Sequence, residues 1–376
     1  MATAGATLPD DVILEIVARL EEASAIFRCA ATCRRWRALL SQPAFLRPLW
    51  PDRSFIGFFT NEWRRGEGVS FVPVPRSTLG AGRRFLSSYI PDAPTLSDWV
   101  LPLASHHGLL LVRLFPRNSR HMQLAVCDPL AGKWDVLPTL SMNEATDFVG
   151  YAIVATGADC SSPLSSFRVL LVRTDKYGQD YLLYHFSSDC RRWRIPVKWP
   201  DDLERILRRS TIAHMDAVVC HSGVAFWLVV KLTNLYILSV DSQTCYVALT
   251  QLLITVNHHE RFRLTTTTDG TLLSLCTYDG DRSVEIWEQQ YTDGNVSWLC
   301  TKVLKLRLQL QGARCMCLGA RSGRLVLMDR HQRVYVLDLK GGAMEEMNDK
   351  FDDPNLTAVP MEIDWPVFFM SQLRPM

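Results

Sequence analysis

Residues 105–138 read SHHGLLLVRLFPRNSRHMQLAVCDPLAGKWDVLP, and this stretch decides how most of the chain is interpreted. A glycine turn at Gly108 leads into one aliphatic run, and a second run, LAVC, is followed by the polar turn DPLAGK and a further short run. Short apolar runs bounded by Gly, Asp and Ser are typical of antiparallel strands joined by hairpins. Such a unit buries its faces only against neighbouring units, so the pattern predicts repeated copies.

Both halves of this pattern recur, at intervals that suit a β-propeller. Each unit offers about four strands over roughly 45 to 60 residues, near the length of a propeller blade. The glycine turns lie at 105–113, 220–229, 267–276 and 320–328. The hairpins lie at 124–138, 181–196, 235–249, 284–300 and 334–347. Five units are countable. A sixth could come from residues 51–101 or the tail, with residues 352–366 as a ring-closing strand. A barrel or sandwich competes, but neither predicts paired glycine and aspartate turns at this period.

The first fifty residues have a helical period instead. Val12, Ile16 and Leu20 recur every four residues, which places them on one helical face. A second helix is expected over residues 24–40, and Pro43 marks its end. This hairpin is either a cap docked on the rest of the chain or a module whose remaining apolar surface binds a partner. Periodicity alone does not choose between these two interpretations.

The run LPDDVILEIVARLEEASAIFRCAATCRRWRALLSQPAFLRPLW, residues 8–50, resembles an F-box. The match is carried by Leu8-Pro9-Asp10-Asp11 at the start, Cys33-Arg34-Arg35-Trp36 in the middle, and Pro43 with Phe45 at the end. The resemblance implies binding to the Skp adaptor of Skp–cullin–F-box ubiquitin ligases, and through the adaptor to a cullin. It also implies which residues contact the adaptor: Leu8, Pro9, Val12, Ile16, Leu20, Ile26, Cys33 and Trp36. Some of these residues must instead hold the helices together, Trp36 most obviously.

The remainder resembles the propeller-like domain that follows the F-box in many plant F-box proteins, where DPLAGKWDVLP-type hairpins recur. The sequence therefore predicts a small all-α F-box over residues 1–50, a junction with irregular strands over 51–100, and an all-β, irregular propeller-like domain over 101–376. The function that the resemblance implies is that of a non-catalytic substrate-recognition subunit, whose propeller binds a protein target for ubiquitination. A non-degradative adaptor-binding scaffold, and a propeller enzyme or small-molecule sensor, remain the alternatives.

Composition limits the remaining function classes. The 376 residues are 48% hydrophobic and 21% charged, with a formal net charge of +2, so no strong basic field favours a nucleic-acid partner. The start of the chain lacks the pattern of a secretory signal, and its most apolar stretch is too short and interrupted to cross a membrane. The eleven cysteines are scattered, as in a reducing compartment. We expect an intracellular protein of the nucleus, the cytoplasm or both.

The sequence holds no recognisable catalytic constellation, so neither a cofactor nor a metal is expected. The two adjacent histidine pairs, His106-His107 and His258-His259, would point to opposite faces of a strand and could not ligate one metal simply. Two close cysteine pairs, 29 with 33 and 315 with 317, are interpreted as buried structural thiols. The run RRWR at 191–194 contains the ingredients for stacking on bases, but its place in a repeated hairpin favours a structural role.

Overall fold

The structure is a computed structural model. It describes residues 8–20, 23–49, 55–61, 68–75, 77, 82–91, 100–115, 121–141, 146–155, 166–175, 181–194, 197–208, 210–220, 222–252, 261–266, 273–278, 283–292, 295–306, 310, 313–351, 357–366 and 368–369.

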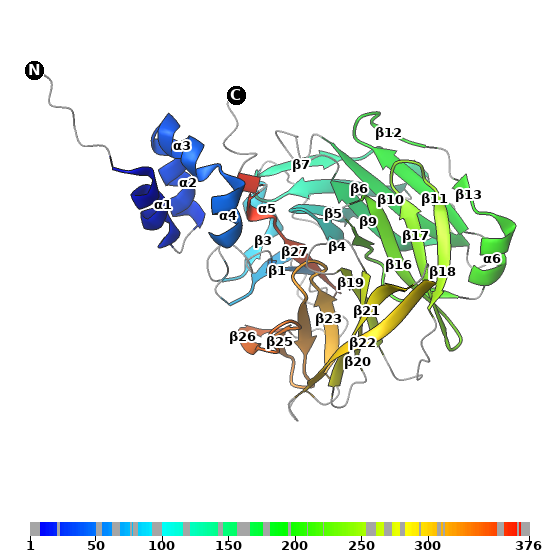
Figure 1. The fold of residues 1–376 in the computed structure, drawn as a ribbon. Helices are drawn as coiled ribbons and strands as arrows, with labels where there is room; N and C mark the ends of the chain where they lie inside the picture. Colours follow the sequence, from blue (N-terminus) through cyan, green and yellow to red (C-terminus); the bar gives the residue numbers. More distant parts are fainter. Residues whose placement is uncertain are drawn as a thin grey trace, which may run out of the picture.

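The described residues form six antiparallel sheets, which we call blades 1 to 6 (Figure 1). Blade 1 has the order β27 (Thr357–Glu362), β1 (Phe55–Asn61), β2 (Ser70–Pro73) and β3 (Arg84–Phe85). Blade 2 has the order β4 (Val100–His106), β5 (Leu109–Leu114), β6 (His121–Asp128) and β7 (Lys133–Val136), and β8 (Leu140–Ser141) also pairs with β6. Blade 3 has the order β9 (Thr146–Ala155), β10 (Phe167–Asp175), β11 (Tyr181–Ser187) and β12 (Arg192–Trp193), and β13 (Val197–Lys198) also pairs with β11.

The other three blades follow the same plan. Blade 4 has the order β14 (Thr211–Ile212), β16 (Val224–Lys231), β17 (Asn234–Asp241) and β18 (Val247–Leu252), and β15 (Val218–Val219) also pairs with β16. Blade 5 has the order β19 (Arg261–Thr266), β20 (Leu273–Tyr278), β21 (Ser283–Thr292) and β22 (Asn295–Lys305). Blade 6 has the order β23 (Arg314–Leu318), β24 (Arg324–Met328), β25 (Arg333–Asp338) and β26 (Met344–Lys350).

The innermost strands of neighbouring blades contact one another around a closed ring, and in blade 4 the contacting strand is β15. β27 contacts β4, β4 contacts β9, β9 contacts β15, β15 contacts β19, and β23 contacts β27. Blades 5 and 6 are joined by the Thr266 N–H, which donates to the Ala320 carbonyl over 2.9 Å. The chain is therefore a propeller, and the sequence prediction of an all-β propeller-like domain is confirmed.

The strand that closes the ring shows that the propeller begins before residue 101. β27, near the C-terminus, pairs with β1 from Phe55↔Glu362 to Asn61↔Thr357. Residues 51–100 were predicted to be a junction, but their strands β1, β2 and β3 form blade 1 together with that C-terminal strand. Residues 51–101 thus supply the sixth unit, which the sequence left open, and the ring-closing strand considered within 352–366 is present. A strand paired with a segment some 300 residues away carries no local sequence signal.

The glycines of the repeated turns have the backbone conformation that the turns require. Gly108 between β4 and β5 has a φ of +83°, and Gly323 before β24 has a φ of +65°. Residues with a Cβ rarely adopt this region, so glycine is favoured where each innermost strand turns into the next. His107 shares the turn with Gly108 and has a φ of +49°.

The N-terminal helices are α1 (Asp10–Ala18), α2 (Ala23–Thr32), α3 (Arg34–Leu40) and α4 (Pro43–Leu49). The single helix expected over 24–40 is thus broken at Cys33, whose backbone is extended with φ −159° and ψ 166°. Its Sγ accepts the Trp36 N–H over 3.5 Å and so caps α3. Side chains of this capping kind compete with the helical backbone and favour a break at that position. Elsewhere, short helices lie at α5 (Leu86–Tyr89) and α6 (Asp201–Leu207).

The helices share an apolar core with blades 1 and 2, beside which they lie in Figure 1. Phe27 of α2 packs against Phe369 and Phe368 of the C-terminal segment, with ring centroids 4.5 Å and 6.0 Å apart. The helical residues buried in this core are Val17, Ile26, Ala30, Leu40 and Leu46. The helical module is therefore docked on the propeller and is not a separate body. No helix among the described residues is long and apolar enough to span a membrane.

The basic run at 191–194 holds two blades together. Arg191 of blade 3 forms a two-bonded ion pair with Asp135 of blade 2, at 2.9 and 3.1 Å. Trp193 donates its indole N–H to the Pro138 carbonyl over 2.7 Å. These contacts give the run the structural role that was favoured from its position in the hairpin.

The buried His185 of β11 should make the stability of the folded protein depend on pH. The side chain is 2% exposed, and burial, with Arg194 and Arg168 nearby, lowers its pKa from 6.5 to about 4. Between these two values the unfolded chain binds a proton that the folded chain does not, so acidification destabilises the fold. We expect the free energy of unfolding to fall by about 2 kcal/mol from pH 7 to pH 5 because of this group.

Denaturant titrations at several pH values test this expectation. His185→Leu should flatten the curve over this interval, whereas the exposed His331→Gln serves as the control and should leave it unchanged. An unaltered pH dependence in His185→Leu would contradict the assignment.

Candidate functional site

The first helix has two apolar faces with different surroundings. Ile13 and Val17 are 1% and 0% exposed, so this face belongs to the protein's own interior. Leu8 and Ile16 are 50% and 42% exposed, and Val12 between them is half-buried. We call Leu8, Pro9, Val12 and Ile16 the α1 surface. The sequence predicted these four residues as adaptor contacts, and the fold leaves them accessible as one group at the start of α1.

Arg35 fixes the position of this surface relative to α3. Its Nε donates to Asp10 Oδ1 over 2.9 Å, and its Nη2 donates to the Leu8 carbonyl. Pro9 precedes the helix as its N-cap, and the Ile13 N–H donates to the Pro9 carbonyl over 3.1 Å. Because Arg35 holds both the entry to α1 and its first turn, Leu8 keeps a defined place on the surface.

The other four predicted contact residues are distributed differently. Leu20 and Trp36 are partly buried and pack against the shared core. Ile26 is 1% exposed and lies inside that core, so it stabilises the helices and offers no surface to a partner. Cys33 is exposed, which corrects its interpretation as a buried thiol, and the Trp36 N–H lowers its pKa. Helical period alone did not distinguish an outward from an inward face.

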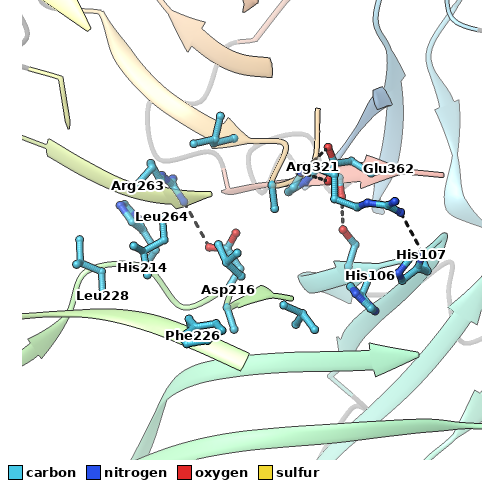
Figure 2. A pocket seen from close by; sticks show the side chains of 17 residues that line it. His106, His107, His214, Asp216, Phe226, Leu228, Arg263, Leu264, Arg321 and Glu362 are labelled. Carbon is cyan, nitrogen blue, oxygen red and sulfur yellow. Dashed lines mark hydrogen bonds and ion pairs between the residues drawn. The ribbon is translucent and has the colours of Figure 1, made fainter. Parts of the chain in front are cut away.

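A second candidate site lies at the centre of the ring, where the innermost strands end. Figure 2 shows the pocket, which is open to solvent and is lined by residues from blades 1, 2, 4, 5 and 6. One wall is apolar and includes Phe226, Leu228 and Leu264, and the facing wall carries His106, His107, Arg321 and Glu362. Asp216 lies between these walls, and Arg263 lies beside Leu264 and reaches towards Asp216. The site thus combines an apolar surface with charged and imidazole groups.

The polar wall is built by the turn that precedes β24. The Arg321 and Ser322 N–H groups donate to the Glu362 carboxylate over 2.8 to 3.2 Å. The Arg321 guanidinium forms an ion pair with Asp364 at 3.0 Å, and its Nη1 contacts His107 Nδ1 at 3.4 Å. A guanidinium only donates, so His107 Nδ1 is the acceptor. This wall therefore links blade 6, the end of β27 and the β4–β5 turn.

Arg263 projects from β19 into the middle of the pocket. Its Nη2 donates to the Met316 carbonyl over 3.0 Å, and its Nη1 lies 3.4 Å from Asp216 Oδ1. His214 Nε2 contacts the Phe262 carbonyl at 2.6 Å. None of these residues stands out in the sequence, because they lie in strands and loops that come together only in the closed ring.

The paired histidines depart from the expectation for strand neighbours. His106 and His107 both line the pocket, with ring centroids 4.2 Å apart, because the turn begins at His107 and leaves the alternating geometry of β4. The Ala155 N–H donates to His106 Nδ1 over 3.1 Å. Among the described residues, no group of three or more His, Cys, Asp or Glu side chains is placed to hold a metal ion. His258-His259 lies outside the described residues.

Comparison with known proteins identifies the helical module. Residues 6–48 match the F-box-like family model, a range that includes the α1 surface, the Arg35 contacts and α2 to α4. The chain is also 28% identical over 249 residues to F-box protein At5g49610 of Arabidopsis thaliana, a match that covers 63% of this chain and 62% of that protein. The N-terminal helices thus match the F-box-like model and are followed by a propeller, and the chain is similar to a plant F-box protein over about two thirds of its length.

Solved structures resemble the chain at low sequence identity. TolB from Acinetobacter baumannii is 12% identical with a TM-score of 0.47, and the match covers 87% of this chain and 73% of TolB. The Cps50 (Swd1) β-propeller domain of Myceliophteria thermophila is 11% identical with a TM-score of 0.41, covering 78% of this chain and 87% of that one. The sheet order and ring closure described above establish the propeller without these similarities.

Shortening an isoleucine to alanine should cost different amounts of stability on the two faces of α1. Ile13→Ala should lower the free energy of unfolding by about 2–4 kcal/mol, because it leaves a cavity where a fully buried side chain stood. Ile16→Ala should lower it by less than about 1 kcal/mol, since much of that side chain is already in water. Urea titrations of both variants measure the difference. Equal losses would show that the outward face of α1 is also buried in the protein.

Proposed function

We propose that this protein is the substrate-recognition subunit of a Skp–cullin–F-box ubiquitin ligase. The observation that carries the proposal is the α1 surface: within an F-box-like domain, Leu8 and Ile16 stay exposed while Ile13 and Val17 pack inward. Exposed apolar side chains grouped on one helix are typical of helix-mediated docking. In this proposal the Skp adaptor covers the α1 surface and connects the chain to a cullin.

The propeller supplies the surface that holds the target, and the chain itself performs no covalent step. A target held beside a ubiquitin-loaded enzyme experiences a high effective concentration of that enzyme, which converts a slow bimolecular encounter into a local one. The shared core supports this mechanism, because it holds the helices and the propeller in one orientation. A defined orientation keeps the distance between bound adaptor and bound target constant.

Adaptor binding tests the proposal directly. The double variant Leu8→Ala/Ile16→Ala should bind the Skp adaptor at least about tenfold more weakly than the wild type, because roughly 1.4 kcal/mol of apolar burial is lost. Surface plasmon resonance with immobilised adaptor measures the dissociation constants. Circular dichroism establishes that both proteins are folded.

Glu15→Ala is the matched control, because Glu15 lies on α1 in an exposed pair with Arg19 and outside the α1 surface. It should bind as the wild type does. Failure of the wild type itself to bind the adaptor would refute the proposal. Binding without any effect on ubiquitination or half-life of captured targets would instead assign the chain to the non-degradative scaffold class.

A further inference from the structure

The hydrogen-bonding groups of the central pocket are not balanced. Its two guanidinium groups and two carboxylates, Arg263 and Arg321 with Asp216 and Glu362, cancel in formal charge. Each guanidinium, however, carries five N–H donors in a fixed fork. The balance of donors and acceptors therefore decides what the pocket can bind.

The Glu362 carboxylate of the pocket already accepts hydrogen bonds from the protein backbone. Glu362 Oε1 accepts from the Arg321 and Ser322 N–H groups at 3.2 and 2.8 Å, and Oε2 accepts from the Arg321 N–H at 3.1 Å. The Arg321 side chain, in turn, is paired with Asp364. These bonds serve ring closure, so Glu362 is occupied in holding the turn before β24.

Arg263 has more N–H donors than there are hydrogen-bond acceptors around it. Its Nε is buried and has no hydrogen-bond acceptor among the described residues. Its ion pair with Asp216 is long, at 3.4 Å, and involves one nitrogen and one oxygen, whereas guanidinium–carboxylate pairs favour two parallel bonds. The Arg263 side chain is 15% exposed, so part of it remains accessible from the pocket and can meet an incoming acceptor.

The two imidazoles that line the pocket are each engaged at Nδ1. His106 Nδ1 accepts from the Ala155 N–H, and His107 Nδ1 accepts from Arg321. In the neutral ring, an acceptor at Nδ1 requires that Nε2 carries the proton. The acceptor best suited to the Arg263 guanidinium is a carboxylate, whose two oxygens match two parallel N–H groups.

The apolar wall restricts the ligand further. Leu228 and Leu264 are 3% and 6% exposed, and half-buried Phe226 and Val218 extend the same wall. A ligand that fills the pocket must place an apolar group against this wall while its carboxylate lies towards Arg263. The pocket is open to solvent, so a segment of a larger molecule can enter it.

We propose that the central pocket binds an acidic residue with a neighbouring apolar residue in the polypeptide of the target. This inference rests on the proposed function, which requires that the propeller hold a protein. The carboxylate pairs with Arg263, and the apolar side chain packs on Phe226, Leu228 and Leu264.

A panel of hexapeptides, blocked at both ends, tests this assignment on the full chain. Each peptide carries one Glu and one Leu, Ile, Val or Phe at varied spacing, and matched peptides carry Gln or Lys in place of Glu. Fluorescence anisotropy should show at least tenfold tighter binding of the best Glu peptide than of its Gln counterpart. Arg263→Met should reduce binding of that Glu peptide at least tenfold.

Two further variants keep the test decisive if Arg263→Met does not fold. Ala320→Leu fills the pocket without changing its charge, and it should weaken the same peptide at least tenfold. Arg192→Met, at an exposed position of β12, is the matched control and should leave binding unchanged. Equal binding of Glu and Gln peptides, or undiminished binding in Ala320→Leu, would overturn the proposal.

Hexanoate, a free acid with an apolar tail, is titrated in parallel. Binding of hexanoate at Arg263 without binding of any peptide would assign the pocket to a small organic acid and overturn the polypeptide assignment. Adaptor binding is measured on the same samples. Intact adaptor binding with no preference for Glu refutes only the pocket, whereas loss of adaptor binding in the wild type refutes the proposed function.

Discussion

The pairing of β27 with β1 holds the ring closed, and both candidate sites depend on it. The two strands come from opposite ends of the chain, yet their register is continuous from Phe58↔Pro360 to Asn61↔Thr357. Without β27, blade 1 would lose its innermost strand and leave the edge of β1 unpaired. The central pocket would lose its Glu362 wall at the same time, because Glu362 is the last residue of β27.

The residues that follow β27 connect this closure to the helices. Asp364 pairs with Arg321 of blade 6, and Phe368 and Phe369 pack on Phe27 of α2. One short segment thus closes the ring, orders a wall of the pocket and anchors the F-box-like domain. Its position explains how a target held at the pocket would keep a fixed relation to an adaptor held at the α1 surface.

Sequence patterns predicted the elements that local spacing determines. The glycine turns and polar hairpins gave the propeller, and the order of residues in 8–50 gave the F-box-like domain that the family model matches. Pairing between distant segments was harder to predict from the sequence. Strands β1 to β3 were interpreted as a junction because their partner β27 lies at the other end of the chain. The pocket was missed for a similar reason, since Arg263 and Asp216 meet only across blades. Four-residue spacing placed Val12 and Ile16 correctly on one face, but it could not show that Ile26 is buried.

Hydrogen exchange followed by mass spectrometry on the full chain tests the closed ring most directly. We expect the amides of β27 to exchange as slowly as those of β1 and of the innermost strands β4 and β9, because all four strands open only with the whole ring. Rapid exchange of residues 357–362, with continued protection of the other blades, would contradict it. The C-terminal strand would then be dispensable, and neither the pocket wall nor the docked helices could depend on it.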